Sequence, residues 1–224
     1  VLDFIESKDG GIDRMMMHDR ITGYKEGINS RGVSILNTSL DVGDDETEVE
    51  SGAAKSSPDG RMIAEALTLP TAERAMRHLI KKQLCGCTMV FDSENMFLIE
   101  ASNWDGKRPY RYKARQIPPT EVVARTNHGI WMPTAGMHRS PRDKRKTLDR
   151  ISSESRLMLA QAVVESAQRP QDLADGMCQV FVNHPQLNIL RTSTDGRKMR
   201  TTSQQLCVPK ERTLYCRPVS SHMK

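Results

Sequence analysis

Residues 23–40 read GYKEGINSRGVSILNTSL and predict two strands joined by a tight turn. The turn falls on Asn-Ser-Arg-Gly at 29–32, because asparagine and glycine tolerate the backbone angles that tight turns require. Val33, Ile35 and Leu36 supply the apolar side of the second strand. Asn29 and Gly32 are therefore turn residues in the simplest interpretation, and a direct functional role is the alternative.

Extended segments continue on the N-terminal side of this hairpin. Residues 1–5 and 13–18 predict two further strands around a Lys-Asp-Gly-Gly turn at 8–11. Residues 41–59 are first acidic, then small and polar, and they show no apolar periodicity. This composition predicts a surface loop.

Helices and strands alternate after that loop. We expect a short helix over 60–67 and a longer one over 71–83, with apolar side chains on one face and Arg and Lys opposite. Residues 88–101 predict a hairpin with its turn at 92–95, and a further strand is expected near 110–114.

The C-terminal third predicts two more helices and a final hairpin. Ser152 or Ser153 can cap a helix that reaches about residue 167, and Pro170 suits the first turn of the next helix. Residues 199–219 predict two strands around a Pro-Lys-Glu-Arg turn.

Length and composition favour one globular domain of the α+β class. The 224 residues predict a single domain over 1–224, with surface loops at 41–59 and 138–150. Hydrophobic residues make up 37% and charged residues 27%, and no stretch reaches the roughly 18 apolar residues of a membrane span. Because the chain begins without Met and without a signal peptide, we expect a cytoplasmic protein from which an upstream segment was removed or omitted.

The cysteines argue against a disulfide framework. Five is an odd number, and Cys85 and Cys87 are followed by no second cluster that would complete a zinc site. Reduced thiols of a cytosolic protein are the default interpretation. We expect no metal and no cofactor.

The chain is basic, with a net charge of +5. Much of the excess lies in residues 138–150, which could contact phosphates. This loop lacks the interleaved aromatic residues of a single-strand binder and the spacing of known DNA-binding motifs. A solvated loop is the favoured interpretation, and a nucleic acid or another polyanion is the alternative partner; no membrane partner is expected.

Residues 121–131, EVVARTNHGIW, change abruptly from apolar to polar side chains. An apolar run that suits a buried strand ends in Asn127 and His128, just before Gly129. Turn-forming residues at a strand end are one interpretation. The other is a catalytic amide held rigidly at the end of a strand.

Three segments in this order resemble one family: EGINSRGVSILNTSL (26–40), VVARTNHGI (122–130) and ISSESRLMLA (151–160). From about residue 22 to MRTTSQQL (199–206), the chain is similar to the choloylglycine hydrolase and penicillin V acylase group, including relatives of the acyl-coenzyme A:6-aminopenicillanic acid acyltransferases. These are N-terminal-nucleophile (Ntn) hydrolases. The resemblance implies a four-layer αββα sandwich that cleaves linear amides.

The resemblance also assigns roles to individual residues. In that family a cysteine exposed as the first residue attacks the amide, and its own α-amine accepts the proton. Asn127 would direct its side-chain N–H at the oxyanion, and Asn37 or Thr38 would lie on the oxyanion side as well. Arg156 would lie beside the nucleophile, although an ordinary surface arginine in the first turn of a helix is the alternative. His128 would satisfy a hydrogen bond at the strand end.

The sequence departs from the family at the nucleophile. The family's cysteine would lie before Val1, so the N-terminal strand that carries it, and the Arg and Asp that follow it, are missing. Gly86-Cys87-Thr88 imitates a self-cleavage junction, which makes Cys87 an alternative nucleophile. However, the glycine-asparagine turn precedes Cys87 and should follow a nucleophile, so a small buried residue is the favoured interpretation of Cys87.

The sequence therefore predicts a linear amide hydrolase or acyltransferase, with a small amide as substrate. A catalytically inactive scaffold and a basic protein that binds a polyanion through 138–150 are the alternatives. We expect a homo-oligomer, and a separate N-terminal fragment could supply the missing strand.

Overall fold

The computed structural model describes residues 2–19, 23–38, 40, 58–102, 110–133, 144–177 and 203–218. They belong to two compact units. The first unit comprises residues 1–120, 127–137 and 207–214, and the second comprises 121–126, 138–206 and 215–224. The single domain expected over 1–224 stays a prediction. No helix among the described residues is long and apolar enough to cross a membrane.

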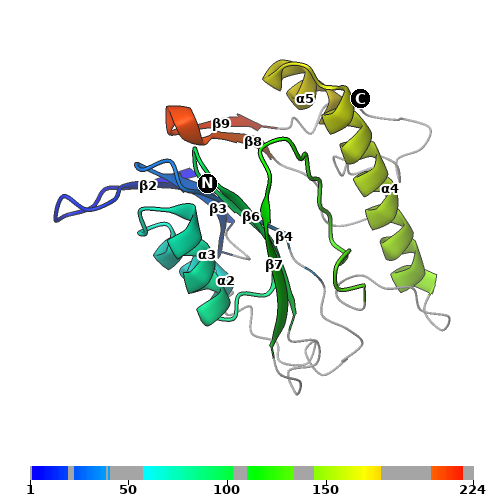
Figure 1. Cartoon of the computed structure of the whole chain (residues 1–224), viewed down its shortest axis with the longest axis horizontal. Coiled ribbons are helices and arrows are strands. Elements are labelled where there is room, and N and C mark those ends of the chain that lie inside the picture. The colour runs from blue at the N-terminus through cyan, green and yellow to red at the C-terminus, as the bar shows by residue number, and fades with distance from the viewer. Residues whose placement is uncertain are drawn as a thin grey trace. The chain divides into compact units, whose positions relative to one another are not determined.

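A seven-stranded antiparallel sheet is the framework of the first unit (Figure 1). Its strands follow one another in chain order: β1 (Leu2–Ile5), β2 (Arg14–Asp19), β3 (Gly23–Asn29), β4 (Ser34–Thr38), β5 (Gly86–Phe91), β6 (Met96–Ser102) and β7 (Arg111–Ile117). Such an order suits strands joined by hairpins, with helices inserted after β4. The predicted α+β class is confirmed.

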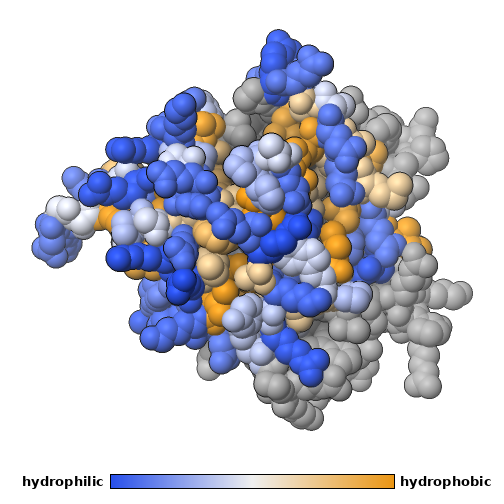
Figure 2. All heavy atoms as spheres, in the orientation of Figure 1, coloured by the Kyte–Doolittle hydropathy of each residue, from blue (hydrophilic) through white to orange (hydrophobic). Residues whose placement is uncertain are grey.

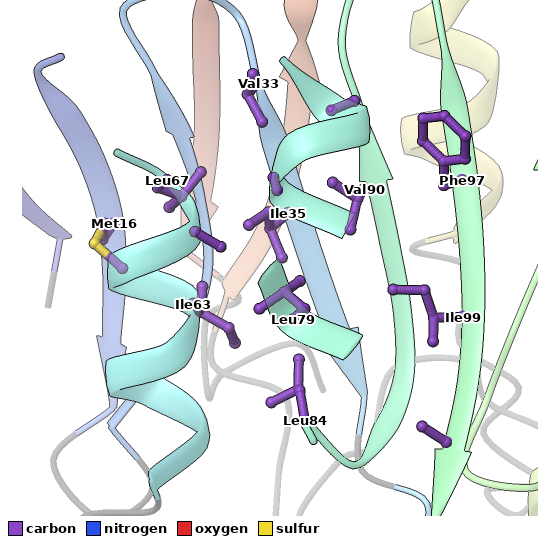
Figure 3. Close-up of a cluster of buried hydrophobic side chains, with 14 residues drawn as sticks. Met16, Val33, Ile35, Ile63, Leu67, Leu79, Leu84, Val90, Phe97 and Ile99 are labelled. Atoms are coloured by element: carbon purple, nitrogen blue, oxygen red, sulfur yellow. The ribbon is translucent and has the colours of Figure 1, made fainter. Parts of the chain in front are cut away.

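Two helices, α2 (Pro58–Ala66) and α3 (Ala72–Lys81), cover one face of this sheet. Figure 3 shows apolar side chains of the sheet and of both helices meeting in one core. The largest fully buried members include Met16, Ile35, Ile63, Leu67, Leu79, Val90 and Ile99. The amphipathic helix expected over 71–83 is confirmed as α3, which Thr71 caps by accepting from the backbone N–H of Arg74 at 3.3 Å.

The β5–β6 turn also holds the start of α3. Asp92 Oδ1 accepts from the backbone N–H groups of Glu94 and Asn95, both at 2.9 Å. Its Oδ2 accepts from the N–H of Ala72 at 2.8 Å, which is the first residue of α3. One carboxylate therefore closes the turn predicted at 92–95 and joins it to the helix, where a negative charge is favourable.

The β3–β4 turn is built around Asn29, which is 2% exposed. Its Oδ1 accepts from the N–H groups of Arg31 and Val33, both at 2.9 Å. Its Nδ2 donates to two carbonyl oxygens of the α2–α3 connection, at 2.9 Å each. Gly32 has φ +85°, a conformation that favours glycine. The interpretation of Asn29 and Gly32 as turn residues is confirmed.

The second unit contains α4 (Lys144–Ser166) and α5 (Pro170–Met177). The expectation that residues 144–150 belong to a loop was wrong, because α4 begins at Lys144, and Lys, Arg and Leu are good helix formers. Ser152 and Ser153 accordingly do not cap the helix but lie within it, buried. Residues 138–143 and most of 41–59 lie outside the described residues.

Near the C-terminus the chain forms a two-stranded hairpin, as predicted. Strands β8 (Ser203–Val208) and β9 (Thr213–Pro218) pair across a 3-10 turn at Pro209–Glu211. Arg212 closes the turn with φ 52° and donates its N–H to the carbonyl of Pro209 at 3.0 Å.

Candidate functional site

A row of four residues crosses the sheet on the face opposite α2 and α3. The strand register places Thr38 of β4 beside Cys87 of β5, Cys87 beside Glu100 of β6, and Glu100 beside Lys113 of β7. Because side chains alternate between the two faces of a strand, all four lie on one face. The alternate positions Ile35, Val90 and Ile99 belong to the helix-covered core. We call Thr38, Cys87, Glu100 and Lys113 the cross-sheet row.

Asn127 reaches the first member of this row. Its Nδ2 donates to Thr38 Oγ1 at 3.0 Å, although 89 positions separate the two residues. The contact orients the amide of Asn127, because a side-chain amide held by a hydrogen bond loses its freedom to rotate. The structure thus brings together two of the candidate oxyanion residues.

Asn37 lies on the other face of β4. Its Oδ1 accepts from Thr88 Oγ1 at 2.8 Å, and its side chain also lies against Gly86, where an added Cβ would be 2.6 Å from Oδ1. Asn37 is 7% exposed, and its Nδ2 is a buried donor without a hydrogen-bond partner in the described part of the chain. Of the two oxyanion positions that the sequence left open, Thr38 is the one that meets Asn127.

Glu100 is a buried member of the cross-sheet row that the sequence did not single out as a candidate. Its carboxylate is 0% exposed and accepts from three consecutive backbone N–H groups, those of Ile130, Trp131 and Met132, at 2.7 to 3.1 Å. These bonds fasten the segment that follows Asn127 onto β6. The available signal was a single carboxylate within the apolar run Phe-Leu-Ile-Glu-Ala at 97–101.

Cys87 lies between Thr38 and Glu100 in the cross-sheet row and is 2% exposed. The expectation that it is a small buried residue is confirmed. A second thiol, Cys207, is held in the neutral form: burial, and to a lesser extent the charge of Glu26, raises its pKa to about 12. Cys207 is therefore a poor nucleophile at neutral pH.

Arg156 lies in the middle of α4 and is 8% exposed, so its interpretation as a surface arginine in a first turn was wrong. Ser153, one turn earlier, is fully buried, and its Oγ donates to Thr126 Oγ1 at 3.0 Å, while Thr126 Oγ1 donates to the Ser153 carbonyl. Asn127 and Arg156 belong to different units, so the implication of the resemblance that both lie beside one nucleophile stays a prediction.

His128 is 4% exposed and lies beside Asn127 in the chain. Its assignment to a strand-end hydrogen bond stays a prediction. Within the described residues, no group of three His, Cys, Asp or Glu side chains has the arrangement to hold a metal ion.

The chain matches no protein-family model. No curated protein is similar enough to it to count as a relative.

Proposed function

We propose that the protein hydrolyses a linear amide, or transfers its acyl group, through a cysteine thiolate. The observation that carries the proposal is the 3.0 Å hydrogen bond from Asn127 Nδ2 to Thr38 Oγ1. It joins residues 122–130 to β4, the strand that follows the turn at 29–32, and the resemblance to Ntn hydrolases implies an oxyanion residue in each of these two segments. Neither residue is needed by the main hydrophobic core, which occupies the other face of the sheet.

In the proposed reaction the thiolate attacks the amide carbon and forms a tetrahedral intermediate with a negative oxygen. Asn127 donates its side-chain N–H to this oxygen, and the hydrogen bond to Thr38 fixes the orientation of the Asn127 amide. The intermediate then expels the protonated amine and leaves an acyl thioester, which water hydrolyses or an acceptor amine takes over. Glu100 fixes the backbone after Asn127 and so limits movement of the donor.

The first choice of nucleophile is a cysteine upstream of residue 1, with its own α-amine as proton acceptor. This arrangement requires the four-layer αββα sandwich and an additional N-terminal strand. The exposed apolar side chains of β1 support a second layer, because Leu2 (44% exposed) and Phe4 (65% exposed) lie on the face opposite the helix-covered core. As an end strand of the described sheet, β1 also has a side on which a further strand could pair.

Cys87 is the second candidate nucleophile, and its position in the cross-sheet row favours it. It lies on the face that Asn127 reaches, directly beside Thr38. Its 2% exposure argues against it, since the thiolate must meet a substrate.

The test uses the natural protein, whose N-terminus is first determined by mass spectrometry, and a panel of linear amides. Loss of one oxyanion donor costs about 10²–10³ in kcat, so Asn127→Ala should lower kcat by that factor at an unchanged melting temperature. Cys87→Ser should retain activity if the nucleophile lies upstream, and should abolish it if Cys87 attacks. Absence of turnover with every amide, in a folded protein that starts with cysteine, would point to an inactive scaffold and end the proposal.

A further inference from the structure

Strand β7 is a long, regular and exposed strand at one end of the described sheet. It is the last strand of the sheet, and no other strand of the described residues pairs with its outer side. Its inner side pairs with β6 over seven consecutive residue pairs without a register shift. All of its residues except Ile117 are exposed, and it contains no proline and no bulge.

The basic side chains of β7 all lie on one face of the sheet. Arg111, Lys113 and Arg115 alternate on the face opposite α2 and α3, where their cross-strand partners are Ser102, Glu100 and Leu98. The single negative charge among these partners, Glu100, is fully buried and accepts from three backbone N–H groups. The outer strand therefore carries three positive charges in line, along a backbone edge with which no described strand pairs. In the space-filling view, hydrophilic residues in the region of β7 are interspersed with apolar ones (Figure 2).

Aromatic rings support this edge. The guanidinium of Arg115 lies over the ring of Trp131, 5.3 Å from its centroid, which holds the charge in place. On the other face the rings of Tyr110 and Tyr112 are stacked, with centroids 5.8 Å apart. Tyr110 in turn donates its hydroxyl to the carbonyl of Leu84 at 3.0 Å. Both ends of the strand are thus tied to the body of the unit.

We propose that β7 binds an extended acidic peptide of a partner protein, which adds to the sheet as an eighth strand. Main-chain hydrogen bonds to the open edge would provide affinity, and acidic residues at alternate positions would pair with Arg111, Lys113 and Arg115. The same charges disfavour pairing of β7 with a second copy of itself, because like charges would then face each other.

A nucleic acid fits these observations less well than a peptide. It could use the three charges, but it lacks the alternating backbone donors and acceptors that match the N–H and C=O groups of a strand edge. The rings suited to stacking bases are also engaged, since Arg115 covers Trp131 and the two tyrosines stack on each other.

The test is fluorescence anisotropy with the full chain and a labelled peptide in which Glu alternates with Val and Thr. The double variant Arg111→Glu, Lys113→Glu should weaken binding by about tenfold or more. The control variant Arg74→Glu, Lys81→Glu changes the net charge equally on exposed positions of α3 and should bind as the parent does.

Peptides with N-methyl groups on alternate residues separate strand pairing from simple charge attraction. Methylation of the amides that face β7 should abolish binding, and methylation of the other set should preserve it. Equal binding of both methylated peptides, equal weakening by the control variant, or tighter binding of a single-stranded oligonucleotide than of the peptide would each overturn the proposal.

Discussion

Replacement of Glu100 tests whether one buried carboxylate holds the segment after Asn127 on the sheet. Glu100→Ala leaves three backbone N–H groups without their acceptor in a site that is 0% exposed. Each buried donor that loses its partner costs about 1–3 kcal/mol, and relief of the buried charge offsets part of the sum. We expect a loss of about 3–5 kcal/mol in the free energy of unfolding. Glu100→Gln keeps one acceptor oxygen and should lose about 2 kcal/mol.

Urea unfolding followed by tryptophan fluorescence measures these losses, and Trp131 itself lies in the affected segment. Hydrogen exchange adds a local test, because the amides of 130–132 should exchange faster in both variants than in the parent. Glu94→Gln is the matched control, since Glu94 is exposed in the β5–β6 turn, and it should change stability by less than about 0.5 kcal/mol. A loss below about 1 kcal/mol for Glu100→Ala, with unchanged exchange at 130–132, would refute the anchoring role.

Three further predictions concern the fold and its thiols. Asn29→Ala should destabilise the first unit by about 2–4 kcal/mol in urea unfolding, because it removes four hydrogen bonds of a buried side chain. Gly32→Ala should cost more than Gly10→Ala in the same assay: both glycines have positive φ, but an added Cβ at Gly32 would lie 2.6 Å from a backbone carbonyl, whereas nothing lies within 4 Å at Gly10. Cys207 should resist iodoacetamide at pH 8 in the folded protein and react only after unfolding or as the pH approaches about 12, as mass spectrometry of labelled peptides would show.

The sequence predicted those elements whose hydrogen bonds and packing patterns are formed by residues close together in the chain. The turn at 29–32 follows from an asparagine that bonds to the backbone two and four residues on. The helix α3 follows from the apolar face that its sequence shows, and the Thr71 cap is a local contact of the same kind. The β5–β6 turn is similar, since Asp92 accepts from the backbone N–H groups two and three residues on.

Predictions failed where the deciding partner lies far away in the chain. Ser153 has the chemistry of a helix cap, but the hydroxyl is bound to Thr126, 27 positions earlier, and the helix begins well before it. Glu100 is a lone carboxylate in an apolar strand, and the sequence does not show its partners. These are the N–H groups of 130–132, which lie 30 or more positions later. A propensity or a cap rule contains no information about such partners.

One face of the sheet packs against helices and stabilises the fold, and the opposite face carries the residues of the proposed reaction. Adjacent residues of one strand lie on different faces. Asn37 and Thr88 point to the helix-covered face and bond to each other there, so changes at either should act on the core. Thr38 and Cys87, one position along each strand, lie on the face that Asn127 and Glu100 occupy. A shift of one residue in register would exchange these roles completely, since side chains alternate with a period of two. The resemblance placed the oxyanion residue at Asn37 or Thr38, with an uncertainty of a residue or two, and in the structure Thr38 is the one of the pair that bonds to Asn127.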